Sequence, residues 1–194
     1  LGAIAVPRLV RKIDKMVVFR VSALLTVVLG VVMWLIGYDS TMKFFVINTL
    51  RSIPMSTLGV MLFMFTPDCA EYGKFKTGIE AKGITFSIQT FMVKLTGAIS
   101  SALSVFLLGL PVVGWVNVEA ENFEQLSQMG VTQTPEALDA FWLIYALIPS
   151  IGYLASYIVW RFYKLNDKDV QVMAECNAGK ITKAEAETKL SRKY

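Results

Sequence analysis

Apolar residues in this chain gather into four long runs, at about residues 16–37, 42–66, 84–110 and 140–163. Each run is at least as long as the ~20 residues that a helix needs to cross a ~30 Å hydrocarbon core. The pattern predicts an all-α integral membrane protein whose residues 16–163 form four transmembrane helices. Thr134 and Pro135 suit an N-cap and a first helical position, so the last helix is expected to begin before its apolar run.

The polar segments between these runs alternate in charge. Residues 1–15, 67–83 and 164–194 hold all of the lysines and arginines outside the runs, whereas residues 38–41 and 111–139 hold none. Cytoplasmic loops are enriched in Lys and Arg, so the first set is predicted to be cytoplasmic, the C-terminal tail included. Thr182 and Glu185 have the spacing of a capping box, which predicts a short last helix in that tail.

The third run carries its polar residues on one helical face. At 100° per residue, Gln89, Thr90, Val93 and Lys94 fall on one arc. Lys94 lies roughly ten residues, or ~15 Å, from either end of the run, so its ammonium group does not easily reach the headgroups. A charge at that depth costs at least ~2.5–3.5 kcal/mol unless it finds water or a polar partner. The face therefore indicates a water-filled cavity or substrate path, with a buried structural ion pair as the alternative.

Arg51 is a second cation near the middle of a run. It is either a cavity residue or a member of a structural ion pair, and no Asp or Glu lies within any of the four runs. If Arg51 and Lys94 need carboxylate partners, these must therefore come from another part of the protein. The chain opens without methionine, and residues 1–15 look like the end of an earlier span followed by a basic loop. We therefore expect a fragment whose N-terminal part is missing.

Composition narrows the possible functions. The chain has 194 residues, 55% of them hydrophobic, and contains no histidine. Its two cysteines, Cys69 and Cys176, lie far apart outside the apolar runs, which predicts neither a disulfide nor a metal site. A membrane enzyme is not expected, since no run carries an acid–base pair, and no cofactor or metal is expected. The net charge of +4 follows membrane sidedness and does not indicate nucleic acid.

Residues 67–94, PDCAEYGKFKTGIEAKGITFSIQTFMVK, resemble the glycoside-pentoside-hexuronide:cation symporters, which are melibiose-permease-like members of the major facilitator superfamily. The resemblance is carried without a gap by Asp68, Tyr72, Gly73, Lys76, Gln89, Thr90 and Lys94. It extends more weakly over most of the chain. It implies that the four spans are about helices nine to twelve of a twelve-helix transporter bundle in the cell (inner) membrane.

The resemblance also implies roles for particular residues. In the family, the sugar lies between two six-helix halves, and the positions that line its cavity here are Gln89, Thr90, Val93 and Lys94. The segment that opens or closes the cytoplasmic gate would contain Asp68, Glu71, Tyr72 and Gly73. The family's cation-binding carboxylates belong to the N-terminal half. The site for co-transported Na⁺ or H⁺ is therefore expected mainly in the missing part.

The chain departs from the family pattern at several positions. Gly59 stands where the family has an aromatic residue near the sugar. Glu71 replaces an Asp, Lys74 replaces a Glu, and Glu80 and Lys82 look like a reversed Arg/Glu pair. The reversal either preserves an ion pair with opposite polarity or removes a contact to another cytoplasmic loop.

Two functions remain open from the sequence. The first is a secondary transporter of glycosides or related sugars, coupled to Na⁺ or H⁺, whose partners are the sugar, the lipid bilayer and the missing N-terminal half. Gln89, Thr90 and Lys94 would supply the hydrogen-bond donors and acceptors that sugar hydroxyl groups need. The second is a non-transporting four-helix membrane scaffold or assembly subunit.

Overall fold

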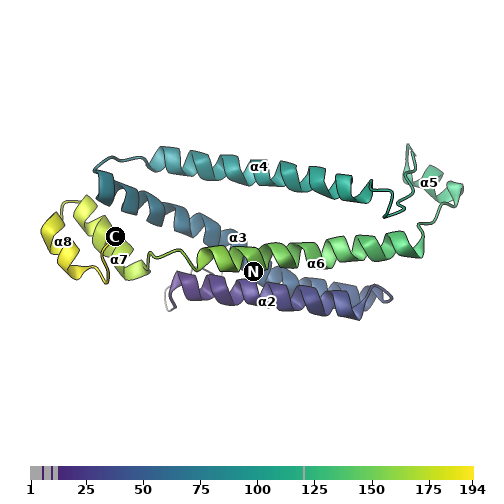
Figure 1. Cartoon of the computed structure of the whole chain (residues 1–194), viewed down its shortest axis with the longest axis horizontal. Helices are drawn as coiled ribbons and strands as arrows, with labels where there is room; N and C mark the ends of the chain where they lie inside the picture. Colours follow the sequence, from purple (N-terminus) through teal and green to yellow (C-terminus); the bar gives the residue numbers. More distant parts are fainter. Residues whose placement is uncertain (1–5, 7–9, 11–12, 120) are drawn as a thin grey trace.

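The computed structural model describes residues 6, 10, 13–119 and 121–194, and all of its secondary structure within these ranges is helical (Figure 1). Four helices are long and apolar enough to cross a membrane: α2 (Lys15–Ile36), α3 (Thr41–Thr77), α4 (Lys82–Leu108) and α6 (Pro135–Trp160). This confirms the predicted all-helical chain with four candidate spans. Most of residues 1–15, expected to contain the end of an earlier span and a basic loop, lies outside the described residues.

α3 runs well past the apolar run that predicted it. Residues 67–83 were expected to be a loop, but the helix continues through Pro67 to Thr77 and leaves only residues 78–81 as the connection to α4. Proline removes one backbone donor, and surrounding contacts can sustain a helix through it. α3 ends at Gly78, whose φ of 74° is left-handed and whose N–H bonds to Lys74 at 2.7 Å. The expected gate segment thus lies on a helix and not in a loop.

α2, α3 and α6 pack together around buried aromatic side chains. The ring of Phe65 on α3 lies 4.5 Å from that of Trp160 on α6 and 5.9 Å from that of Phe19 on α2, between centroids. α6 begins as the sequence predicts: Thr134 accepts a hydrogen bond from Ala137, and Pro135 is the first helical residue. α4, by contrast, has no buried residue, and its ribbon lies on the outer side of α3 and α6 (Figure 1).

Shorter helices occupy the two ends of the bundle. α5 (Phe123–Met129) lies between α4 and α6, whereas α7 (Asp167–Asn177) and α8 (Lys183–Lys189) follow α6 at the opposite end (Figure 1). The capping box at Thr182 and Glu185 is present at the start of α8. Phe75 of α3 packs against Met173 of α7 and Ala186 of α8, all three buried. The polar extension of α3 therefore provides the surface on which α7 and α8 pack.

Asp169 of α7 accepts hydrogen bonds from the last residues of the chain and holds them against this helix. The residue is only 2% exposed, and its carboxylate accepts hydrogen bonds from Ser191 Oγ at 2.5 Å, Tyr194 Oη at 2.6 Å and Asn166 Nδ2 at 2.7 Å. Burial acts to raise the pKa of Asp169, but these hydrogen bonds outweigh it and hold the pKa below its ordinary value. Burial and the bond to Asp169 together raise the pKa of Tyr194 to about 12.

These shifts predict how packing of the tail on α7 depends on pH. Asp169 stabilises the packing of the tail on α7 fully above its unfolded pKa of ~3.9. This stabilisation is lost as the pH falls through its lower folded pKa. Tyr194 stabilises the same packing fully below pH 10.0, its ordinary pKa, and this stabilisation is lost as the pH rises through about 12. The methyl resonance of the buried Met173 should report loosening of the tail at both extremes. Tyr194→Phe should remove the alkaline step, and an unchanged alkaline midpoint in this variant would contradict the assignment.

Candidate functional site

Gln89 and Val93 face a groove between α3, α4 and α6. The groove has a volume of about 580 Å³, and its other walls include Phe65 of α3 and Trp160 of α6. Gln89 donates from Nε2 to the carbonyl oxygen of Leu62 at 3.1 Å. Its Oε1 is buried without a hydrogen-bond partner in the described part of the chain. Gln89 thus retains a free hydrogen-bond acceptor beside a mainly apolar groove.

Thr90 and Lys94 lie on the neighbouring side of α4. They line a separate hollow of about 460 Å³ whose other walls, Phe86, Ser87 and Phe91, also belong to α4. Thr90 donates to the carbonyl oxygen of Phe86 at 2.9 Å, and Lys94 makes no salt bridge within residues 13–119 and 121–194. The four residues expected to line the sugar cavity therefore form two pairs, and the second pair faces away from the other helices.

Arg51 joins three helices through neutral acceptors. The residue is 3% exposed, and its Nη2 donates to the Ala146 carbonyl oxygen and to Ser150 Oγ on α6, both at 3.2 Å. Its Nη1 lies 3.6 Å from the sulfur of Met33 on α2. Arg51 also lines a cavity of about 290 Å³ between α3, α4 and α6. Among the residues described, it has no carboxylate partner, which leaves open both a place in a cavity and an ion pair with an acid from outside this chain.

Gly30 of α2 makes this arrangement possible. A Cβ atom at this position would lie 1.9 Å from Ser150 Oγ, 3.1 Å from Arg51 Nη2 and 3.2 Å from the Ala146 carbonyl oxygen. Only glycine lets α2 approach α6 this closely beside the guanidinium group. Neither Gly30 nor Ser150 was identified from the sequence, although small residues in apolar helices are a known signal of close helix contact.

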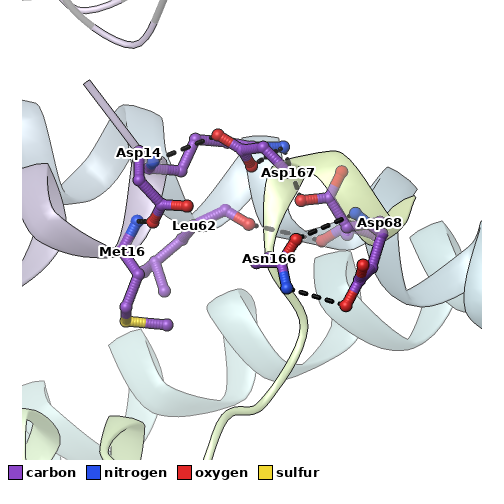
Figure 2. Close-up of polar contacts among 9 residues, drawn as sticks. Asp14, Met16, Leu62, Asp68, Asn166 and Asp167 are labelled. Atoms are coloured by element: carbon purple, nitrogen blue, oxygen red, sulfur yellow. Dashed lines mark hydrogen bonds and ion pairs between the residues drawn. The ribbon is translucent and has the colours of Figure 1, made fainter. Parts of the chain in front are cut away.

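Asp68 connects α3 to the starts of α2 and α7. Its carboxylate is 2.5 Å from Lys15 Nζ, which is also 3.2 Å from the carboxylate of Asp167 on α7. The Lys15 backbone N–H donates to Asp167 as well, and Asp14 caps α2 by accepting from Met16. Figure 2 shows this group of polar side chains where the starts of α2 and α7 meet α3. The first residue of the expected gate thus belongs to an ionic junction of three helices.

The other expected gate residues face α4 and the tail. Glu71 pairs with Lys82 of α4 at 2.7 Å and accepts from Asn177 Nδ2 of α7 at 2.8 Å. The ring of Tyr72 lies 5.9 Å from that of Tyr194, and Gly73 has open space where a Cβ would be. Asp68, Glu71 and Tyr72 therefore contact α2, α4, α7 and the tail from one short stretch of α3. These tail contacts were not anticipated from the sequence.

The residues that depart from the family pattern in this region form two ion pairs. Lys74 and Glu80 form an ion pair at 2.8 Å, and Glu71 and Lys82 form another at 2.7 Å, both across the short connection from α3 to α4. Glu80 and Lys82 thus each pair with a residue of α3 and not with one another. At Gly59, a Cβ would meet no atom within 4 Å, so this position of α3 offers no ring and leaves open space.

Comparison with known proteins places the chain among transporters. A family model described as "MFS/sugar transport protein" matches residues 1–167. A glucuronide carrier protein homolog of Escherichia coli K12 is 27% identical over 163 residues, which are 84% of this chain and 33% of the relative. A putative glycoside/cation symporter of the same organism is 21% identical over 173 residues, or 89% of this chain and 35% of the relative.

A putative sulfoquinovose importer of Salmonella typhimurium is 26% identical over 170 residues, which are 87% of this chain and 33% of the relative. The chain thus spans about a third of the length of these three relatives. No solved structure matches it. Because the family model covers most of the chain, the protein belongs to the sugar transport proteins of the major facilitator superfamily, among the relatives of the glycoside-pentoside-hexuronide:cation symporters.

Proposed function

We propose that this chain supplies helices nine to twelve of a twelve-helix symporter that carries glycosides or related sugars across the cell (inner) membrane, coupled to Na⁺ or H⁺. The lengths of the relatives support this, because the chain covers only 33% to 35% of three transporters that it resembles. Helices one to eight would complete the bundle, and the N-terminal half among them would hold the main cation site. The tail with α7 and α8 would lie in the cytoplasm.

The exposure of α4 is the observation that best supports the proposal. Its helix has no buried residue, although its polar face holds Gln89, Thr90 and Lys94 at the depth of a membrane span. In a bilayer such a face needs water, a polar partner or a second protein surface. A second six-helix half placed against α4 would enclose the Lys94 hollow, which is here lined by α4 alone.

The side chains on this face suit sugar recognition. The amide of Gln89 and the hydroxyl of Thr90 offer both donors and acceptors, and Lys94 offers three donors. Val93 lies beside Gln89 on the apolar groove and would contact the less polar face of a sugar ring. Lys94 would also balance charge with carboxylates of the N-terminal half, so that cation binding and sugar binding affect each other.

The Asp68 junction would act at the cytoplasmic end of the transport path. It joins α2, α3 and α7 through Lys15, while Glu71 ties the same stretch to the start of α4. Relative movement of α4 against α2 and α3 would strain the pairs at Glu71 first. The segment from Asp68 to Gly73 would therefore couple movement of α4 to the tail helices, as a cytoplasmic gate requires.

Substrate counterflow tests this function directly. The intact native protein, purified from its own membranes, is reconstituted in liposomes preloaded with an unlabelled sugar, and entry of the labelled sugar is followed. The panel contains a glucuronide, sulfoquinovose and a neutral glycoside, and Na⁺ or pH is then varied for the active compound. We expect saturable counterflow with one of them. A native protein that shows none with any glycoside, alone or with partners that copurify, would favour the scaffold alternative.

A further inference from the structure

A basic hollow lies at the end of the molecule, outside the proposed sugar site. It has a volume of about 510 Å³, within the ~300–1,000 Å³ typical of small-molecule pockets. It opens between the end of α3, α8 and the last residues of the chain. We call it the tail hollow, and its lining residues include four cations and one acid: Lys76, Lys183, Arg192, Lys193 and Glu187.

The positive charge of the tail hollow is poorly compensated. None of its four cations takes part in a salt bridge within the described ranges. Lys76 donates to the backbone oxygen of Tyr194, and Lys183 Nζ lies 5.6 Å from the centroid of the Phe75 ring. Glu187 is the one acidic side chain in the lining, so four cations face a single carboxylate. Gathering like charges around one hollow is unfavourable until an anion enters it.

The tail hollow is also held in shape before any ligand arrives. Ser191 and Tyr194 are both hydrogen-bonded to Asp169, so the two cations between them, Arg192 and Lys193, lie on a backbone segment anchored at each end. Phe75, which is 7% exposed, forms the floor. Preorganised cations lose less conformational entropy on binding than mobile surface lysines do.

From this geometry we propose that the tail hollow binds a small phosphate-bearing anion. Arginine forms bidentate hydrogen bonds with phosphate oxygens, and the ammonium groups of Lys183 and Lys193 add charge around them. The aromatic rings of Phe75 and Tyr194 give the hollow an apolar side that suits an organic phosphate ester. The same chemistry would recognise either a soluble phosphate ester or the headgroup of an anionic lipid.

The test measures anion binding by the intact transporter in nanodiscs. Pyrophosphate is titrated calorimetrically in discs of phosphatidylcholine, and hydrogen exchange of residues 183–193 is compared between these discs and discs that contain phosphatidylglycerol. Arg192→Gln with Lys193→Gln is expected to weaken anion binding about 25-fold, at about fivefold for each charge. Lys168→Gln with Lys180→Gln removes the same charge from exposed tail positions outside the hollow. This control should change affinity less than twofold.

The outcomes separate the two sources of phosphate. Calorimetric binding that the hollow variant loses identifies a soluble ester, whereas protection seen only with phosphatidylglycerol, and lost in the same variant, identifies a headgroup. Arg192→Lys should retain part of the affinity, because it keeps the charge while losing the bidentate contact. Equal weakening in the hollow and control variants, or neither binding nor protection, would overturn the proposal. Sugar counterflow is scored separately, so failure here leaves the transport function standing.

Discussion

Gly30→Leu is expected to lower the free energy of unfolding of the three-helix unit formed by α2, α3 and α6 by about 3–6 kcal/mol. The Cβ of the new side chain would lie 1.9 Å from the present position of Ser150 Oγ and 3.1 Å from that of Arg51 Nη2. Displacing these atoms breaks two hydrogen bonds to a buried charge, each worth about 1.5–3 kcal/mol. Gly30→Ala places a Cβ at the same point but adds no further atoms, and it should cost about 1–3 kcal/mol through overpacking.

The measurement is the thermal unfolding midpoint of the intact transporter in detergent. Gly152→Leu is a matched control, because it lies on α6 near Ser150 but a Cβ there meets no atom within 4 Å. It should leave the midpoint nearly unchanged. Combining Gly30→Ala with Ser150→Ala should cost less than the sum of the two single changes, since the closest clashing atom is removed. Equal destabilisation by Gly30→Leu and Gly152→Leu would show that α2 and α6 do not meet as described.

The position of Arg51 could be predicted from the sequence, but its surroundings could not. A cation near the middle of an apolar run is conspicuous, and the absence of Asp and Glu from the runs indicated that any carboxylate partner would come from outside this chain. The acceptors within the chain are instead a backbone carbonyl at Ala146 and the hydroxyl of Ser150. A backbone carbonyl has no side-chain signature, so the contact between α3 and α6 depends on packing that only the folded chain defines.

The sequence predicted the apolar parts of the helices more accurately than the structure of the polar segments between them. Residues 16–37 were predicted as a span, and α2 covers Lys15–Ile36, because helix length and apolar length are both fixed by crossing a bilayer. The extension of α3 beyond Pro67 was missed. It is polar and contains proline, and it is supported by contacts from α7, about a hundred residues later, such as Asn177 to Glu71. Contacts between residues so far apart in the chain leave no pattern in the local sequence.

Lys94→Leu is expected to abolish concentrative sugar uptake by the intact transporter while folded protein remains in the membrane. If Lys94 donates two hydrogen bonds to the substrate or its coupled carboxylates, losing them at about 1.5–3 kcal/mol each lowers transport at least about 100-fold. Initial uptake rates in cells, corrected for protein in the membrane, measure this. Lys94→Arg keeps the charge with a different shape and should retain a small fraction of uptake.

The unfolding midpoint of the Lys94→Leu protein is a second measurement that separates a transport role from a packing role. Lys94 has no salt bridge in the part of the chain that the structure describes, so leucine removes an expensive mid-membrane charge without stranding a partner within it. Loss of Lys94 should therefore lower the unfolding midpoint less than loss of the buried contacts of Arg51, because only carboxylates supplied by the N-terminal half would be left unpaired. Lys43→Leu, near the start of α3, removes one charge far from α4's middle and should leave uptake intact. Normal uptake in Lys94→Leu, or equal loss in Lys43→Leu, would mean that the polar face of α4 serves helix packing and not transport.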